Sequence, residues 1–402
     1  MSHGLVVLML ALLLGIQPIT TDLYLPALPM LTAGFGASVA QAQLTLTALL
    51  LAFGLSQLVW GPLSDRFGRR PILLVGISLN VLASVACALS PSMFWLIVFR
   101  ALQGAAMGAA VMCARAIVRD LFSPADGARA ISQALSGLGV MATLCVPLGA
   151  LLAQRFGWRS ALLGMTVFSV AVLLLVALRF KESLLKPNLD ALNLKVLWKT
   201  WFLILCNPTF RAFASLSSAT YGGLFTYLAA SSFVFISALG LKPLEYSLVM
   251  TSTALAYIPG TFFARASLKV RGVRRTVAIS AAISLAGGAL LVLLALLEVR
   301  NPWVLILPLC IYMFGHGTHQ ACGTSGSVGP FPQAAGAAAA LNGFLMMVLA
   351  FAIGAWLGKA LGGTVSPHDA VMTLALGVGF FSVCVAFVAW VLVQRHGATV
   401  AH

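Results

Sequence analysis

Twelve stretches of mostly apolar residues follow one another along the chain, separated by polar connections. A helix that crosses the hydrocarbon core of a bilayer needs about 20 such residues and satisfies its backbone hydrogen bonds internally. The pattern therefore predicts an all-α polytopic membrane protein with twelve transmembrane helices. The stretches are residues 5–33, 41–63, 72–90, 93–117, 127–153, 158–180, 210–239, 245–267, 276–297, 302–323, 335–360 and 370–394.

The composition argues against the soluble alternatives. Of the 402 residues, 61% are hydrophobic and 8% are charged, whereas a soluble domain is about 45–50% apolar and about 25% charged. A soluble enzyme, a nucleic-acid binder or a disordered chain of this length needs far more charged surface. The net charge of +15 reflects basic residues in short loops between apolar runs, which indicates membrane topology.

One long polar connection, residues 181–208, divides the chain into two six-helix halves, residues 1–180 and 209–402. With the N-terminus placed inside, eighteen of the 24 Lys and Arg residues fall in cytoplasmic loops or helix ends, and five fall on the opposite side. Arg100 is the remaining one and lies within a span. This asymmetry predicts that both termini are cytoplasmic. We expect the first span to be retained rather than cleaved, because residues 1–4 lead directly into it.

A weak internal repeat relates the two halves. Short, basic, glycine-containing segments follow the second span of each half, residues 65–70 (DRFGRR) and 269–275 (KVRGVRR). Gly68 permits a tight turn there. Two parallel six-helix repeats are one established transporter plan, with the substrate site between them near the membrane midplane. The sequence therefore predicts two six-helix pseudo-repeats that rock about a central cavity.

Asp22 is the one acidic residue predicted inside a span. The apolar run from Leu5 to Phe35 has 31 residues, about 46 Å of helix, so we expect Asp22 near mid-depth. A carboxylate there costs about 2.5 kcal/mol or more, which points to a group that faces a cavity and serves function. Exchange of a proton is one role, and a structural ion pair is the alternative. Pro26 and Pro29 are expected to loosen the outer part of this span.

Arg100 is the one basic residue within a predicted span. It lies about 12 Å from the outer surface, a depth that could bring it near Asp22. The alternative is an arginine that extends its guanidinium to the outer interface.

Several motifs resemble one transporter family. Residues 61–71 (GPLSDRFGRRP), between the second and third spans, closely resemble the loop signature of the major facilitator superfamily. Further segments are similar to motifs of its Bcr/CflA drug-resistance branch: residues 22–29 (DLYLPALP), 100–104 (RALQG), 114–120 (ARAIVRD) and 329–332 (GPFP). The resemblance covers nearly the whole chain and implies the twelve-helix fold of that superfamily.

The resemblance also implies residue roles. Asp22 would carry the proton, and Arg100 would tune its protonation. A cytoplasmic latch would stabilise the outward-facing state, with its arginines pairing with the carboxylate of Asp120 at the end of span four. The latch residues would be Gly61, Asp65, Arg66, Gly68, Arg69, Arg70 and Asp120.

The substrate cavity has weaker signals. Aromatic and amide side chains could line it or pack between helices. The candidates are Gln17, Tyr24, Tyr221, Phe225, Tyr227, Tyr257 and Asn342. His316 and His319 have i,i+3 spacing in the tenth span, which suits a cavity pair, a second protonation site or a metal site. We expect no metal, because no third ligand is evident nearby.

Together these features predict a transporter rather than an enzyme. We expect export of small, mostly apolar drugs, such as compounds like chloramphenicol or bicyclomycin, across the bacterial inner membrane in exchange for protons. Proton-coupled transport of a nutrient or metabolite is the alternative within the same fold, and an intramembrane enzyme or sensor is the alternative from another class. We expect no cofactor, because the proton gradient supplies the energy and no ATP-binding motif is visible. The expected partners are drug, protons and lipid, without nucleic acid, and the expected state is a monomer.

Overall fold

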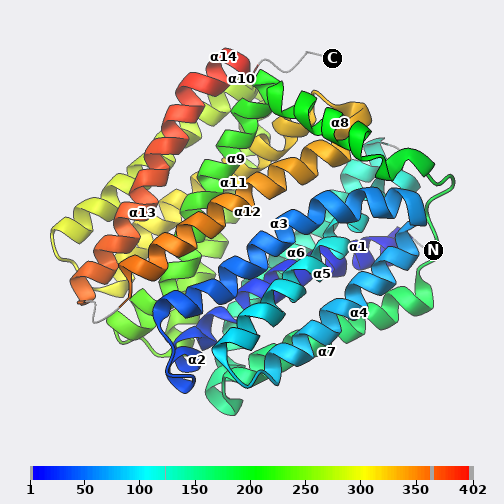
Figure 1. The fold of residues 1–402 in the computed structure, drawn as a ribbon. Coiled ribbons are helices and arrows are strands. Elements are labelled where there is room, and N and C mark those ends of the chain that lie inside the picture. Colours follow the sequence, from blue (N-terminus) through cyan, green and yellow to red (C-terminus); the bar gives the residue numbers. More distant parts are fainter. Residues whose placement is uncertain (1–2, 123, 363–365, 398–402) are drawn as a thin grey trace. The chain divides into compact units, whose positions relative to one another are not determined.

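The structure is a computed structural model that describes residues 3–122, 124–362 and 366–397. Helices form all the regular secondary structure within these ranges (Figure 1). The chain divides into two compact units. Unit 1 comprises Met1–Ala37 and Leu44–Lys199, and unit 2 comprises Ser38–Gln43 and Thr200–His402.

Unit 1 holds the first six predicted spans. Within it, α4 packs against both α5 and α7, and α1 packs against α6 (Figure 1). Its elements are α1 (His3–Asp22), η1 (Leu25–Ala27), α2 (Leu28–Gly34), α3 (Val39–Phe67), α4 (Arg69–Ala88), α5 (Met93–Leu121), α6 (Pro124–Phe156), α7 (Trp158–Arg179) and η2 (Leu189–Leu192).

Unit 2 holds the last six spans. Helix α9 packs against α11, α12 and α13, and a buried apolar cluster that includes Phe213, Val277 and Val385 joins α9, α10 and α13. Its elements are α9 (Pro208–Ser231), η3 (Ser232–Ala238), α10 (Pro243–Leu296), α11 (Pro302–Val328), η4 (Pro332–Ala334), α12 (Ala335–Ala360), α13 (Pro367–Phe387), η5 (Val388–Leu392) and α14 (Val393–His396).

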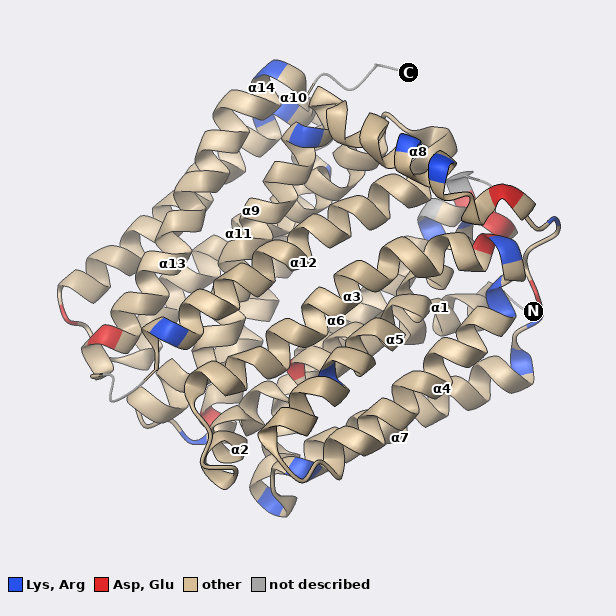
Figure 2. Cartoon of the chain, viewed as in Figure 1, with Lys and Arg blue, Asp and Glu red and all other residues tan. Residues whose placement is uncertain are grey.

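Ten helices among the described residues are long and apolar enough to cross a membrane. Two features reconcile this number with the twelve predicted spans. Helix α10 contains both the eighth and the ninth span, because its backbone kinks at Gly272. Helix α11 is the tenth span and has 27 residues, but it carries polar residues that include His316 and His319. The twelve-helix prediction is therefore confirmed. Figure 2 shows that charged residues gather near the helix ends and leave the helix middles almost uncharged.

The first span is broken where its prolines predict. Helix α1 ends at Asp22, the short helix η1 contains Pro26, and α2 resumes at Leu28 with Pro29 in its first turn. A proline lacks the backbone N–H that continues a helix, so its presence interrupts the hydrogen-bond ladder. The break places Asp22 at a helix end instead of mid-helix.

The two glycines of the internal repeat adopt the same unusual backbone. Gly68, between α3 and α4, has φ 98° and ψ 159°, and Gly272 in α10 has φ 69° and ψ 176°. This region of backbone space is essentially reserved for glycine. The repeat seen in the sequence thus corresponds to a repeated turn.

Alanine at either glycine is expected to destabilise the protein, but by different amounts. Gly272→Ala should cost about 1–3 kcal/mol, the strain of a side chain in this region. Gly68→Ala should cost more, because its Cβ would lie 2.5 Å from Oε2 of Glu182, whereas no atom of the described residues lies within 4 Å of the Cβ position at Gly272. Thermal unfolding of both variants in detergent checks the order, and equal midpoints would contradict it.

The central connection is more structured than its polar composition indicates. Helix α8 (Leu194–Cys206) lies within it and contains the boundary between the two units. Its 13 residues extend about 20 Å, which is too short to cross a bilayer. Ile204 is its one buried residue. The sequence contains the cause, because an apolar run from Trp201 to Cys206 follows Lys195 and Lys199.

Candidate functional site

Asp22 stands at the helix break of the first span. It is the last of the 20 residues of α1, in a span of 32 residues. The helix begins beside the end of α5, where the rings of His3 and Phe122 are 5.4 Å apart. At 1.5 Å per residue, Asp22 therefore lies about 28 Å along α1 from that end. Its side chain is partly exposed.

A threonine hydroxyl connects Asp22 to the preceding helical turn. Thr21 Oγ1 lies 2.7 Å from Asp22 Oδ1 and 3.0 Å from the carbonyl oxygen of Gln17. A hydroxyl has one proton to donate but can also accept. Thr21 can therefore donate to a charged Asp22, or accept a proton from a neutral Asp22 while it donates to Gln17.

Arg100 lies beside the helix break but makes no ion pair with Asp22. It is fully buried, so it does not reach outward as an interfacial arginine would. Its Nη1 donates to Thr20 O at 3.0 Å and to Gln103 Oε1 at 2.7 Å, and its guanidinium stacks over the Tyr24 ring at 4.6 Å. Nη2 has no hydrogen-bond partner in the part of the chain that the structure describes. Arg100 thus contacts the residues on both sides of Asp22 without neutralising its carboxylate.

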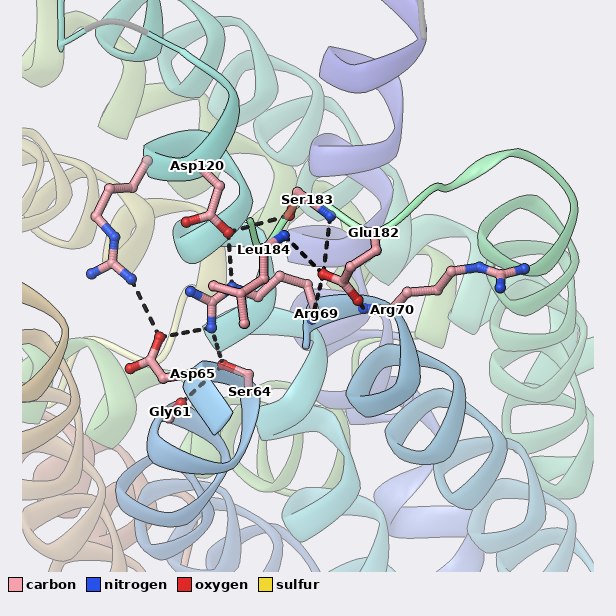
Figure 3. A network of polar contacts seen from close by, with 10 residues as sticks. Gly61, Ser64, Asp65, Arg69, Arg70, Asp120, Glu182, Ser183 and Leu184 are labelled. Carbon is pink, nitrogen blue, oxygen red and sulfur yellow. Dashed lines mark hydrogen bonds and ion pairs between the residues drawn. The ribbon is translucent and has the colours of Figure 1, made fainter. Parts of the chain in front are cut away.

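Arg69 is the centre of a charged cluster at the junction of α3, α4 and α5 (Figure 3). Its guanidinium is 1% exposed and makes ion pairs with Asp65 at 2.7 Å and with Asp120 at 2.9 Å. It also donates to Ser64 Oγ at 2.9 Å. The expected pairing of a loop arginine with the carboxylate at the end of span four is therefore present.

Three further predicted latch residues make hydrogen bonds that involve a backbone carbonyl oxygen. Arg66 donates to the carbonyl oxygen of Leu189 at 3.2 Å, and Arg70 donates to that of Ala177 at 3.0 Å. The carbonyl oxygen of Gly61 accepts from Ser64 Oγ at 2.9 Å. These residues help to hold the cluster, while the ion pairs concentrate on Arg69.

Sequence reasoning gave no role to Glu182, which follows α7 and lies in the polar connection of residues 181–208. Its carboxylate accepts four backbone N–H bonds, from Arg69, Arg70, Ser183 and Leu184, at 2.9–3.0 Å (Figure 3). Partial burial by itself raises the pKa of Glu182, but the four donors outweigh it and hold the pKa below its usual value. One signal existed: Gly68 precedes α4 and has no side chain to cap it, so the helix needs another acceptor.

The seven candidate substrate residues have different environments. Four are buried and three keep partly exposed side chains. Among the buried ones, Tyr24 bonds Thr45 and Tyr227 bonds Thr253, each at 3.0 Å. The buried four are Tyr24, Phe225, Tyr227 and Asn342, and the partly exposed three are Gln17, Tyr221 and Tyr257. Gln17 lies one helical turn before Thr21, so it has the best position for a ligand near Asp22.

His316 and His319 are both buried in unit 2 and have separate partners. His316 Nδ1 lies 2.8 Å from Thr220 Oγ1, and His319 Nε2 lies 3.4 Å from the carbonyl oxygen of Val277. The Tyr257 ring is 5.7 Å from that of His316. Through these contacts, both histidines help to pack α11 against α9 and α10.

The helical bundle and the charged cluster define a polytopic transporter of the type that the sequence motifs indicated. The sequence model of the Major Facilitator Superfamily matches residues 10–355. The chain belongs to this superfamily, whose members are transporters and not enzymes.

Relatives from several bacteria cover most of the chain. It is 31% identical to multidrug resistance protein D of Escherichia coli, over 85% of each chain. It is 30% identical to the uncharacterized MFS-type transporter YdgK of Bacillus subtilis, over 92% of this chain and 94% of that one. It is 28% identical to a chloramphenicol resistance protein of Pseudomonas aeruginosa, over 83% and 78%.

A solved structure shows the same fold. The crystal structure of a D-xylose–proton symporter matches with a TM-score of 0.76 over 96% of this chain and 97% of that one, at 16% identity. Identity this low supports the architecture alone, and the fold prediction is confirmed at that level. The relatives with resistance names agree with the drug-resistance branch that the motifs resemble.

Proposed function

We propose that this protein exports small, mostly apolar drugs, similar to chloramphenicol or bicyclomycin, in exchange for protons by alternating access. The observation that carries the proposal is Asp22, a partly exposed carboxylate at the break of a mostly apolar span, which makes no ion pair among the described residues. Such a residue is costly and marks an ion or substrate pathway. The names of the relatives support drugs as the cargo.

Thr21 gives Asp22 a way to exist in both protonation states. When Asp22 is charged, the Thr21 hydroxyl donates to it, and when Asp22 is neutral, the hydroxyl turns to the Gln17 carbonyl. Each state keeps its hydrogen bonds, so neither a bare charge nor an unpaired proton is left in the protein. Drug binding near Gln17 would compete with the proton for the same carboxylate.

Replacing Thr21 with valine is expected to reduce drug-driven proton release several-fold at neutral pH, because one hydrogen bond to the carboxylate is worth about 1–3 kcal/mol. Valine has nearly the same shape and lacks the hydroxyl. Thr21→Ser is the control and should restore release. The measurement is proton release from detergent-solubilised protein on drug addition, and a valine variant equal to the native protein would exclude this role.

We also infer that the cluster around Arg69 is a latch that stabilises the outward-facing state. Its support is the pair of ion pairs from Arg69 to Asp65 and Asp120, which hold α3, α4 and α5 together at one end of unit 1. Charge-assisted hydrogen bonds from a buried arginine are stronger than those of a surface pair, and Arg69 makes one to each of two carboxylates. Two such contacts can be made or broken together as a unit.

We propose that the protein is a monomer in the bacterial inner membrane, with both termini and the Arg69 cluster on the cytoplasmic side. The support for this orientation is the distribution of the basic residues, because eighteen of the 24 Lys and Arg residues then fall on the cytoplasmic side. The proton gradient supplies the energy, and no cofactor takes part. Labelling of a cysteine introduced near the C-terminus, in right-side-out and everted vesicles, tests the orientation.

A substrate panel in everted vesicles tests the function. Drugs that are exported should collapse a preformed pH gradient, and heterologous expression should reduce susceptibility to the same compounds. Collapse by sugars or metabolites instead would favour the alternative, proton-coupled transport of a nutrient or metabolite. Collapse by no compound in either class would contradict proton coupling.

A further inference from the structure

Residues 182–189, here called the strap, run from the end of α7 across the end of unit 1 that carries the Arg69 cluster. Glu182 Oε1 accepts from the backbone N–H of Arg69 at 2.9 Å, and Oε2 accepts from that of Arg70 at 3.0 Å. These two N–H groups are the first of α4. A carboxylate from 113 residues further along the chain therefore caps the helix that carries Arg69.

The strap also contacts the other helices of the cluster. Ser183 Oγ donates to Asp120 Oδ2 at 3.2 Å, and the N–H of Asn188 donates to the carbonyl oxygen of Asp65 at 2.9 Å. Arg66 donates to the carbonyl oxygen of Leu189 at 3.2 Å. One short segment is thus bonded to α3, α4 and α5, the three helices that the Arg69 ion pairs join.

Helix chemistry explains why Glu182 matters at this position. The first N–H groups of a helix have no partner within it, and a negative charge there is favourable because of the helix dipole. Gly68 occupies the capping position and has no side chain to supply an acceptor. Its lack of a Cβ also leaves room for Glu182, whose Oε2 lies 2.5 Å from the position a Cβ would take.

The second half of the chain shows that the repeat does not require such a cap. At Gly272, which has the corresponding turn, no atom that the structure describes lies within 4 Å of the Cβ position. After Gly272 the side chain that contacts the backbone is an amide and not a carboxylate. Gln394 Nε2 donates to the carbonyl oxygen of Arg274 at 3.1 Å. At the repeated glycine turn, the carboxylate cap is therefore seen in unit 1, the unit with the Arg69 ion pairs.

We propose that the strap positions the latch: Glu182 fixes the N-terminus of α4 so that Arg69 points at Asp65 and Asp120, and its release opens the latch. This inference rests on the proposed latch function. Glu182 is a positioning residue, because it acts through Arg69 and its hydrogen bonds lie at the start of α4 and within the strap. The segment between the halves then controls the latch as well as joining them.

Cys113 provides a readout that does not depend on transport. It lies on α5, is fully buried and neighbours Ser64 of the cluster. We expect Glu182→Gln to speed the alkylation of Cys113 by a membrane-permeant maleimide about tenfold or more, the effect of losing one charge-assisted hydrogen bond. Peptide mass spectrometry separates Cys113 from the other six cysteines.

The matched control is Glu245→Gln. Glu245 also caps a helix, accepting the N–H of Lys242 at 2.9 Å at the start of α10, but it lies in unit 2. We expect it to leave Cys113 alkylation unchanged. Glu182→Asp keeps the charge on a shorter side chain and should give an intermediate rate. If Glu182→Gln fails to fold, two other variants test the strap by the same alkylation rate of Cys113. They are Glu182→Asp and Ser183→Ala, which loses the hydrogen bond to Asp120.

The outcomes separate the strap from the latch. If Arg69→Ala exposes Cys113 and the Glu182 variants do not, the latch stands and the strap proposal is wrong. If Glu245→Gln exposes Cys113 as much as Glu182→Gln, the effect is general destabilisation and the strap proposal is also wrong. If none of the variants, Arg69→Ala included, changes alkylation or drug export, the latch itself is wrong.

Discussion

Asp22→Asn is expected to abolish proton-coupled export while it leaves the protein folded. A pH difference of one unit is worth about 1.4 kcal/mol per proton, enough for about a tenfold drug gradient if one proton exchanges for one drug molecule. Asparagine cannot exchange a proton, so the ratio of drug concentrations across the membrane should fall from about ten to about one. Asn still accepts from the Thr21 hydroxyl, so the local hydrogen bond at 2.7 Å can persist.

The measurement is drug accumulation in everted vesicles together with proton release from purified protein. The control is Asp369→Asn in α13, because that exposed carboxylate also binds a hydroxyl, Ser366 Oγ at 2.6 Å. The control should transport normally. If Asp22→Asn still releases protons on drug addition and still sustains uphill export, the proton lies elsewhere and the proposed role of Asp22 is wrong.

Arg69→Ala is expected to give the second large effect, a loss of about 3–5 kcal/mol of stability, because removal of one partner leaves a nearly buried charge uncompensated. The side chain of Asp120 is 11% exposed. Among the described residues it would lose its ion pair to Arg69 and keep the hydrogen bond from the Ser183 hydroxyl. The same change should shift the protein away from the outward-facing state. Thermal unfolding and crosslinking across the cytoplasmic face measure the two effects.

Arg119→Ala is the matched control for Arg69→Ala. Arg119 also pairs with Asp65, but at 3.4 Å and with a side chain that is 57% exposed. Such pairs contribute about 0–1 kcal/mol. The loss of stability in Arg69→Lys should be intermediate, because lysine keeps the charge but lacks the planar guanidinium that contacts two carboxylates at once. Equal effects from Arg69→Ala and Arg119→Ala would show that burial of Arg69 does not matter.

Much of the fold followed from local patterns. The apolar runs predicted the twelve helices, Pro26 and Pro29 predicted the break after Asp22, and Gly68 predicted the turn before α4. Helix α8 was missed, because its apolar run is short and lies inside a connection of mixed composition. These features depend on residues close in the sequence, so inspection of the sequence can detect most of them.

The site was only partly predictable. The resemblance implied that the latch arginines pair with Asp120, and in the structure Arg69 makes this pair at 2.9 Å. The prediction that Arg100 lies near Asp22 came only from the depth of Arg100 in its span. In the structure Arg100 contacts Thr20 and Tyr24 and makes no ion pair with Asp22. Depth along a helix does not say which way a side chain turns.

The sequence by itself determined the number of spans, the single acid in the first of them and the glycine turn that each half repeats. Each of these is a property of one helix or one loop, set by hydrophobicity and backbone conformation. Only the tertiary structure decided which groups meet: Glu182 capping α4, Arg69 buried between two carboxylates, and the Thr21 hydroxyl placed between Asp22 and Gln17. Contacts across tens to more than a hundred residues depend on how helices pack and rotate, and no local pattern in the chain encodes that.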